Sequence, residues 1–245
     1  MYLIDKNRDD PRRRTLIQML AMGMLGAASP GALAQVANIF GSRPAKLPPG
    51  QSIYRISGTA TINDKPAALG TKVVPGDTVK TGKDSELVFV VNTQAMILRA
   101  NSNVVIEAEK KAESVVVSGL RMLTGALLSV SRNQPMRVRT PTATIGIRGT
   151  GFYMEAEEDR SYFCTCYGAT EVSSNASPDA KETITATQHD RPVYITNDAS
   201  KGQGIVNGPF INHTDLELAL IETLVGRNTP FVFGKDAYNA PRRSY

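Results

Sequence analysis

The chain has 245 residues, a formal net charge of +5 and 21% charged residues. This length is enough for one sizeable core. The positive excess is small and spread along the chain, whereas nucleic-acid binders concentrate Lys and Arg in a dense stripe, so we expect no nucleic-acid partner. The chain has no tryptophan and only 6% aromatic residues, which predicts a core built from β-branched side chains.

Residues 1–34 have the layout of an export signal. A charged segment ending in three arginines precedes an apolar stretch at residues 16–28, and Ala32 and Ala34 form an A-x-A cleavage site. The apolar stretch is shorter than the roughly 20 residues that span a bilayer as a helix. We predict cleavage after Ala34, so that the chain contacts the membrane only transiently through its signal peptide. A retained anchor is the alternative.

Arg13 and Arg14 define the type of signal. They are followed by one polar and two apolar residues, which resembles the twin-arginine pattern. The long charged region and the weakly apolar core favour this route over an ordinary secretory signal. Proteins on this route cross the membrane already folded, often with a cofactor inserted beforehand. We therefore expect a periplasmic or secreted protein of a Gram-negative bacterium.

The remaining chain divides into three parts. Residues 35–51 are rich in proline and predict a linker, residues 52–200 predict a β domain, and residues 201–245 predict a helix and tail. Short alternating segments separated by turns are typical of an all-β sandwich, barrel or β-solenoid. The strands are expected at residues 52–63, 78–81, 86–91, 95–99, 104–107, 114–118, 121–131, 136–140, 143–147 and 151–157.

Residues 140–152, TPTATIGIRGTGF, are the most informative segment. Alternating threonine and isoleucine suit a pleated strand. Gly149 and Gly151 then predict a corner, where a residue without Cβ lets the chain turn or approach another backbone closely.

This segment and several earlier ones resemble the FecR domain, over about residues 53–173. The shared motifs are a Gly-Asp turn, a strand ending in Thr-Gly, a polar segment, a glycine-bearing strand and a closing signature. In this chain they are Gly76-Asp77, Thr81-Gly82, Ala100-Asn101-Ser102-Asn103, Leu123-Thr124-Gly125-Ala126-Leu127, Thr140-Pro141 and Arg148-Gly149-Thr150. The resemblance implies a periplasmic domain of stacked short strands, β-solenoid or sandwich-like, that binds other proteins.

The FecR regulators relay receptor occupancy to a sigma factor. We expect this chain to lack both their cytoplasmic segment and their retained membrane helix, so that only the binding module carries over. The sequence therefore predicts a non-catalytic module whose partner is an envelope protein or a surface ligand.

The two cysteines are expected on the return strand of a hairpin that begins near Gly151. Alternation places Cys164 and Cys166 on one face, while Thr165 and Tyr167 point the other way. A disulfide between residues i and i+2 of a strand would be strained and easily reduced, hence redox-active. Inert buried thiols are a further alternative.

His189 and His213 are the chain's two histidines. With Cys164 and Cys166 they could complete a tetrahedral metal site, although C-x-C is not a standard zinc spacing. The alternative for His213 is a place beside a helix N-cap, formed by Thr214 or Asn212. The competing function is therefore a metal- or redox-active thiol protein.

Residues 215–225 have apolar residues at helical spacing and are followed by Gly226, which predicts a short amphipathic helix. We expect it to cover an open end of the β domain. The alternative is a partner-binding helix with Phe231 and Phe233 as anchors.

Overall fold

The computed structural model describes residues 44–198, 204–230 and 241. The predicted signal, with Arg13, Arg14, Ala32 and Ala34, lies outside these residues and stays a prediction. Phe231 and Phe233 also lie outside them.

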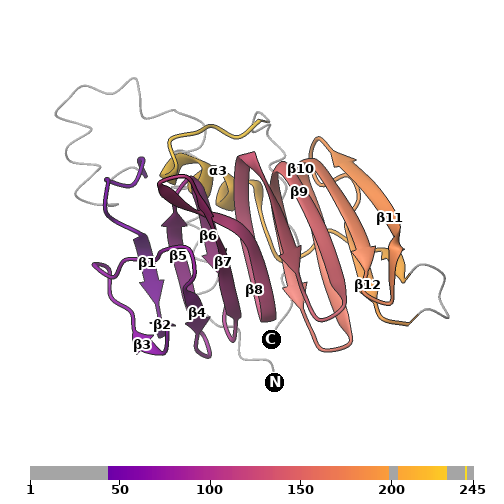
Figure 1. The fold of residues 1–245 in the computed structure, drawn as a ribbon, viewed down its shortest axis with the longest axis horizontal. Coiled ribbons are helices and arrows are strands. Elements are labelled where there is room, and N and C mark those ends of the chain that lie inside the picture. Colours follow the sequence, from indigo (N-terminus) through magenta and orange to yellow (C-terminus); the bar gives the residue numbers. More distant parts are fainter. Residues whose placement is uncertain (1–43, 199–203, 231–240, 242–245) are drawn as a thin grey trace.

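The described part of the chain forms thirteen strands and one helix, which confirms the all-β fold (Figure 1). All thirteen strands belong to one hydrogen-bonded sheet. The strands are β1 (Ile53–Ser57), β2 (Ala60–Ile62), β3 (Lys65–Pro66), β4 (Thr78–Thr81), β5 (Glu86–Val91), β6 (Gln94–Leu98), β7 (Asn103–Lys111), β8 (Ser114–Arg139), β9 (Ala143–Ala156), β10 (Arg160–Ser174), β11 (Ser177–Ala186), β12 (Val193–Thr196) and β13 (Ile205–Asn207).

The strands lie side by side along the long axis of the molecule, in nearly their sequence order (Figure 1). The main path runs β13-β12-β10-β9-β8-β7-β4-β2-β3. The sheet branches at two strands. Strand β8 also pairs with β6, which links β5 and β1 to the sheet, and β10 also pairs with β11. The path ends at β13 and β3, so the sheet is open rather than a closed barrel. Strand β13 comes from the predicted C-terminal part, and the division at residue 200 stays a prediction.

Strands β8 and β9 are longer than the sequence predicts. Three expected strands merge into β8, and β9 continues through the expected corner. The reason is that the glycines bend the strands without ending them. Gly125 and Gly149 have φ values of 89° and 66°, and pairing shifts register between Ser131 and Pro135, opposite Gly149. The predicted corner is therefore a bulge within a continuous strand.

Two apolar clusters occupy the two faces of this sheet. The inner cluster includes Leu87, Phe89, Met96, Phe152 and Phe163, all 0–1% exposed. Its members come from almost every strand, and the described helix belongs to the other cluster. The inner cluster is therefore formed by strand residues along nearly the whole length of the sheet.

The second cluster, called here the helix-side cluster, lies where the helix covers the sheet. It consists of Val88, Ala95, Ile97, Ala126, Leu128, Val130, Tyr153, Tyr162, Cys164, Cys166, Tyr167, Ile211, Leu218, Ile221 and Leu224. Cys164 and Cys166, predicted to share one face of a strand, are thus both core residues on the face opposite the inner cluster.

The helix is α3 (Asp215–Leu224), close to its predicted bounds. Thr214 is its N-cap, and Glu217 completes the predicted capping box. The expected position was wrong, because α3 lies on a face of the sheet against β6 and β8 rather than over an open end. The cause is its apolar stripe, Leu218, Ile221 and Leu224, which enters the helix-side cluster. The described residues contain no helix with the length and apolar character that crossing a membrane requires.

Candidate metal centre

The hairpin of β9 and β10 positions the two cysteines as predicted. Ser161 pairs with Ala156 and Cys164 pairs with Tyr153, and both thiols enter the helix-side cluster. The predicted orientation of Tyr167 was wrong. Register shifts on both sides of Tyr167, and a φ of 90° at Gly168, turn its ring to the same face as the thiols.

The two histidines reach the cysteines from separate segments. His189 lies between β11 and β12, with a φ of 54°, and its backbone N–H donates to the Cys166 carbonyl at 3.0 Å. His213 immediately precedes the N-cap of α3 and follows Asn212, whose φ is 62°. Left-handed backbone is uncommon for residues other than glycine, although Asn and His tolerate it better than most. Both histidines are thus presented by sharp local turns of the chain.

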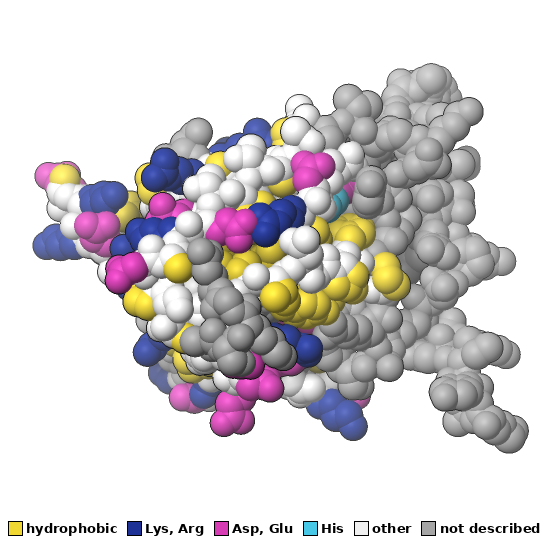
Figure 2. All heavy atoms as spheres, turned by 90° about the vertical axis from the view of Figure 1, so that its right-hand side faces the viewer, with side chains coloured by type: hydrophobic (Ala, Val, Ile, Leu, Met, Phe, Trp, Pro, Cys, Tyr) yellow, Lys and Arg dark blue, Asp and Glu magenta, His cyan; other side chains and the backbone are white. Residues whose placement is uncertain are grey.

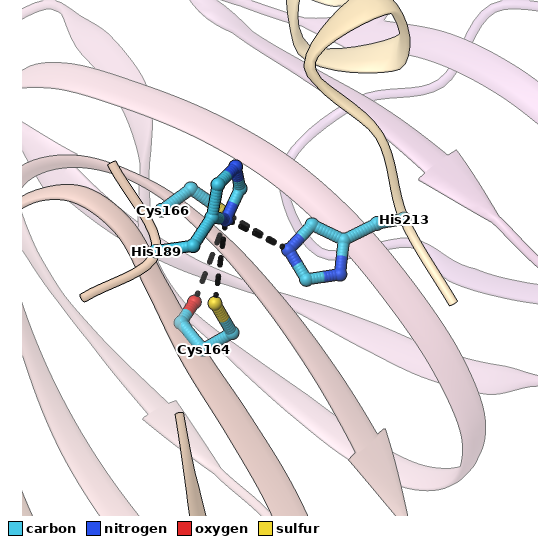
Figure 3. Close-up of side chains that lie close together, drawn as sticks. All are labelled: Cys164, Cys166, His189 and His213. Atoms are coloured by element: carbon cyan, nitrogen blue, oxygen red, sulfur yellow. Dashed lines mark hydrogen bonds between the residues drawn. The ribbon is translucent and has the colours of Figure 1, made fainter. Parts of the chain in front are cut away.

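The structure brings together all four residues that the sequence analysis named. The four ligand atoms lie within 4.8 Å of one another. Cys164 Sγ is 3.5 Å from His189 Nδ1, and Cys166 Sγ is 3.4 Å from His213 Nε2. The two imidazole nitrogens are 3.2 Å apart. Figure 3 shows the four side chains converging, with His213 approaching from the segment that leads into α3.

The cluster is shielded from solvent. Cys164, Cys166 and His213 are 0% exposed, and His189 is 5% exposed. Aromatic rings pack against the imidazoles: Tyr153 stacks on His213 with centroids 4.5 Å apart, and Phe210 lies 4.3 Å from His189. The thiols are free rather than joined in a disulfide.

A second layer of hydrogen bonds orients the imidazoles. His189 Nε2 donates to Asp215 Oδ1 at 2.8 Å, and Gln188 Nε2 donates to Asp215 Oδ2 at 2.7 Å. His213 Nδ1 donates to the Ile211 carbonyl at 2.6 Å. Asp215 was missed in the sequence analysis, because an acidic residue in the first turn of a helix already has a local explanation there. Only the tertiary fold places it beside His189.

The surroundings shift the acidity of these groups. Burial favours the neutral form of Cys164, but hydrogen bonding from Cys166 and the neighbouring histidines outweigh it, so its pKa is lowered. Burial and the adjacent Cys164 raise the pKa of Cys166. Burial lowers the pKa of His189, yet the hydrogen bonds to Asp215 and Cys164 prevail and raise it to about 9. The two thiols are therefore inequivalent, with Cys164 the more acidic.

The signature residues lie apart from this cluster and shape the sheet. The Thr140 hydroxyl accepts hydrogen bonds from the Ala143 N–H at 2.9 Å and the Ser161 hydroxyl at 2.6 Å, in the turn that contains Pro141. Arg148 is exposed and Thr150 is buried on β9, on either side of Gly149. A Cβ added to nearby Gly151 would lie 2.4 Å from the Tyr167 ring, so this glycine makes room for a side chain rather than for the predicted close approach of another backbone.

Comparison with known proteins identifies one part of the chain. Residues 77–169 match a family model described as FecR protein. Two crystal structures of a candidate anti-sigma factor from Parabacteroides distasonis ATCC 8503 are similar to it, each at 14% identity with a TM-score of 0.41. Each covers 60% of this chain, and the alignments cover 74% and 73% of the two solved chains. No curated protein matches the chain. Cys164 and Cys166 fall inside the matched segment, whereas His189 and His213 fall outside it.

Proposed function

We propose that this chain is a non-catalytic binding module exported to the cell envelope, because residues 77–169 match the FecR family model. The family match is the observation that carries the proposal. The FecR resemblance implies a periplasmic domain that acts through protein contacts, and the proposal extends this role to the present chain. Its partner would be an envelope protein or a surface ligand.

The surface of the described residues offers places for such contacts. Large apolar side chains stand exposed at several places. Among them, Val74 before β4 is 50% exposed, Leu123 on β8 is 39% exposed and Val206 on β13 is 44% exposed. On the side that carries β11 and β12, Figure 2 shows apolar side chains among charged side chains of both signs. Protein interfaces combine an apolar centre with a polar, solvent-accessible rim.

Export is the first part of the proposal to test. The double substitution Arg13→Lys and Arg14→Lys is expected to hold the precursor in the cytoplasm, because the twin-arginine route requires both arginines. Cell fractionation and intact mass would show the wild-type chain outside the cytoplasm, shortened by residues 1–34. The matched control, Lys6→Arg with Arg8→Lys, keeps the same charge and should be exported normally. Normal export of the Arg13/Arg14 variant would contradict the twin-arginine prediction, and an uncleaved mass would contradict cleavage after Ala34.

Binding is the second part. A photo-crosslinking amino acid at Val74, Leu123 or Val206 is expected to capture one defined partner in living cells from at least one position. Glutamate at that same position should then weaken the purified binary complex by roughly tenfold or more, because a contact residue that matters contributes over 1 kcal/mol. Lys110→Glu, at an exposed polar position, serves as the control. Uniform capture of many proteins, or equal affinity of all variants, would contradict a specific binding module.

A further inference from the structure

We propose that Cys164, Cys166, His189 and His213 bind one zinc ion in a buried tetrahedral site. This site goes beyond the proposed binding function, and either proposal can hold without the other.

The composition of the chain gives the first reason. It contains two cysteines and two histidines among 245 residues. All four side chains meet in one cluster, although they come from three segments spread over residues 164–213. Two thiols and two imidazoles form one of the standard donor sets of structural zinc sites.

The distances between the donor atoms give the second reason. Zinc bonds of about 2.3 Å to sulfur and about 2.0–2.1 Å to nitrogen imply tetrahedral edges of about 3.3–3.8 Å. The sulfur–nitrogen edges of 3.5 Å and 3.4 Å and the nitrogen–nitrogen edge of 3.2 Å lie close to this range. All four ligand atoms lie within 4.8 Å of one another, so binding a metal ion would require the longer edges to shorten by up to about 1 Å.

The hydrogen bonds behind the imidazoles give the third reason. His189 Nε2 donates to Asp215 and His213 Nδ1 donates to the Ile211 carbonyl, so Nδ1 of His189 and Nε2 of His213 are the ring nitrogens that face the thiols, at 3.5 Å from Cys164 Sγ and 3.4 Å from Cys166 Sγ. These two nitrogens also lie 3.2 Å from each other, a separation close to that of two imidazole ligands on one zinc ion. In zinc sites, a carboxylate or a backbone carbonyl usually accepts a hydrogen bond from the ligating imidazole and thereby fixes its orientation. On binding, Zn²⁺ takes the place of the two protons that the two thiols and two imidazoles hold inside the cluster, and these protons leave to solvent.

A cysteine nucleophile is the main chemical alternative, because Cys164, His189 and Asp215 lie in the order of a catalytic triad. Full burial of Cys164 argues against it, since a nucleophile must reach a substrate. A triad also leaves Cys166 and His213 without a role, whereas a tetrahedral site uses all four side chains.

The position of the site defines its effect on the fold. The cysteines belong to the FecR segment, and the histidines belong to the β11–β12 loop and to the residue before the cap of α3. One ion would therefore fasten the C-terminal part of the chain to the FecR domain. The predicted twin-arginine signal is consistent with such a site, because a protein exported by this route folds, and can bind its metal, before it crosses the membrane.

The test uses the full chain, expressed without a polyhistidine tag and purified without chelators. We expect one zinc ion per chain by elemental mass spectrometry. After zinc is replaced with Co²⁺, tetrahedral thiolate coordination should give intense visible ligand-field bands and a thiolate-to-cobalt charge-transfer band. Cys164→Ser, Cys166→Ser and His213→Gln should each lose most of the zinc and this spectrum. Asp215→Asn should weaken zinc affinity by roughly 10–100-fold while keeping the four ligands.

Thr165→Ser is the matched control, because it lies between the cysteines, turns its side chain away from the cluster and keeps the hydroxyl that meets Thr170. It should retain full zinc content. If the ligand variants fail to fold, the wild-type protein still decides the matter through its metal content and its cobalt spectrum. Folded wild-type protein that contains no zinc, takes up no cobalt from solution and shows two titratable thiols would overturn the proposal.

Discussion

Replacing Arg99 by methionine is expected to lower the free energy of unfolding by about 3 kcal/mol. Arg99 is 8% exposed and joins the sheet to the helix. Its guanidinium donates to Glu86 Oε2 at 2.6 Å, to Glu217 Oε1 at 2.8 Å and to the Asn212 carbonyl at 3.3 Å. Methionine keeps most of the apolar stem, so the loss comes from the charge and its hydrogen bonds.

The size of this effect follows from what remains after the substitution. Two carboxylates are left close together without their common cation, and breaking a buried pair costs about 3–5 kcal/mol. The lower end applies because Glu86 keeps its ion pair with Arg55, and because the Glu86 and Glu217 side chains are 23% and 18% exposed, so water screens part of their repulsion. For a domain of this size, the midpoint of thermal unfolding should fall by about 6–12 °C.

Urea unfolding followed by circular dichroism would measure the change. Arg137→Met is the matched control, because Arg137 is exposed on β8 and a surface substitution usually stays within about 0.5 kcal/mol. A loss below about 1 kcal/mol for Arg99→Met would show that the contact between α3 and the sheet does not depend on this ion network.

Gly125→Ala is the second large effect, with an expected loss of about 3–5 kcal/mol. Gly125 has a φ of 89°, and a Cβ there would lie 2.5 Å from the Cα of Ser102. Strain at such a φ costs about 1–3 kcal/mol, and overpacking of a close backbone adds a similar amount. Ser102 cannot move away easily, because its hydroxyl accepts from the Ala126 N–H at 2.9 Å.

This glycine also determines which side chains face the core. Leu120 and Met122 enter the inner cluster before Gly125, and Leu127 enters it afterwards. Strict alternation would send Leu127 to the opposite face, so the irregularity at Gly125 restores the core position. Loss of this geometry should disturb both clusters at once.

Gly146→Ala provides the matched control on the neighbouring strand. Its added Cβ would meet only Glu171, at an ordinary 3.7 Å, and its φ is not in the left-handed region. The substitution should be neutral or stabilise by up to about 1 kcal/mol, because alanine restricts the unfolded chain. Chemical unfolding of both variants would compare them. Equal stabilities of the two variants would contradict the role assigned to Gly125.

The sequence predicted local features well where short-range physics governs them. Alternating β-branched residues predicted the strands, and Thr214 with Glu217 predicted the start of α3, because both patterns act within a few residues. The strand lengths were predicted less well. Gly149 indicated a break, but a glycine with positive φ permits a corner or a bulge equally, and the partner strands select the bulge.

Longer-range features needed the tertiary structure. Alternation alone put Tyr167 on the wrong face, because the two-residue repeat of strand side chains does not reveal where a bulge shifts the register. The helix was placed at an end of the sheet, although its apolar stripe packs on a face. Arg99 and Asp215 gave no signal, since their partners lie far away along the chain, and the fold alone brings them together.

The sequence by itself determined the all-β class, the FecR segment and the four donor residues that a metal would need. Residue types, turn chemistry and motif order record these features directly. Only the tertiary structure decided that Cys164, Cys166, His189 and His213 meet, that one ring nitrogen of each histidine faces the thiols and that the four side chains are buried. The reason is that donor spacing along a chain does not fix distance in space, which depends on how β10, the β11–β12 loop and α3 pack against one another.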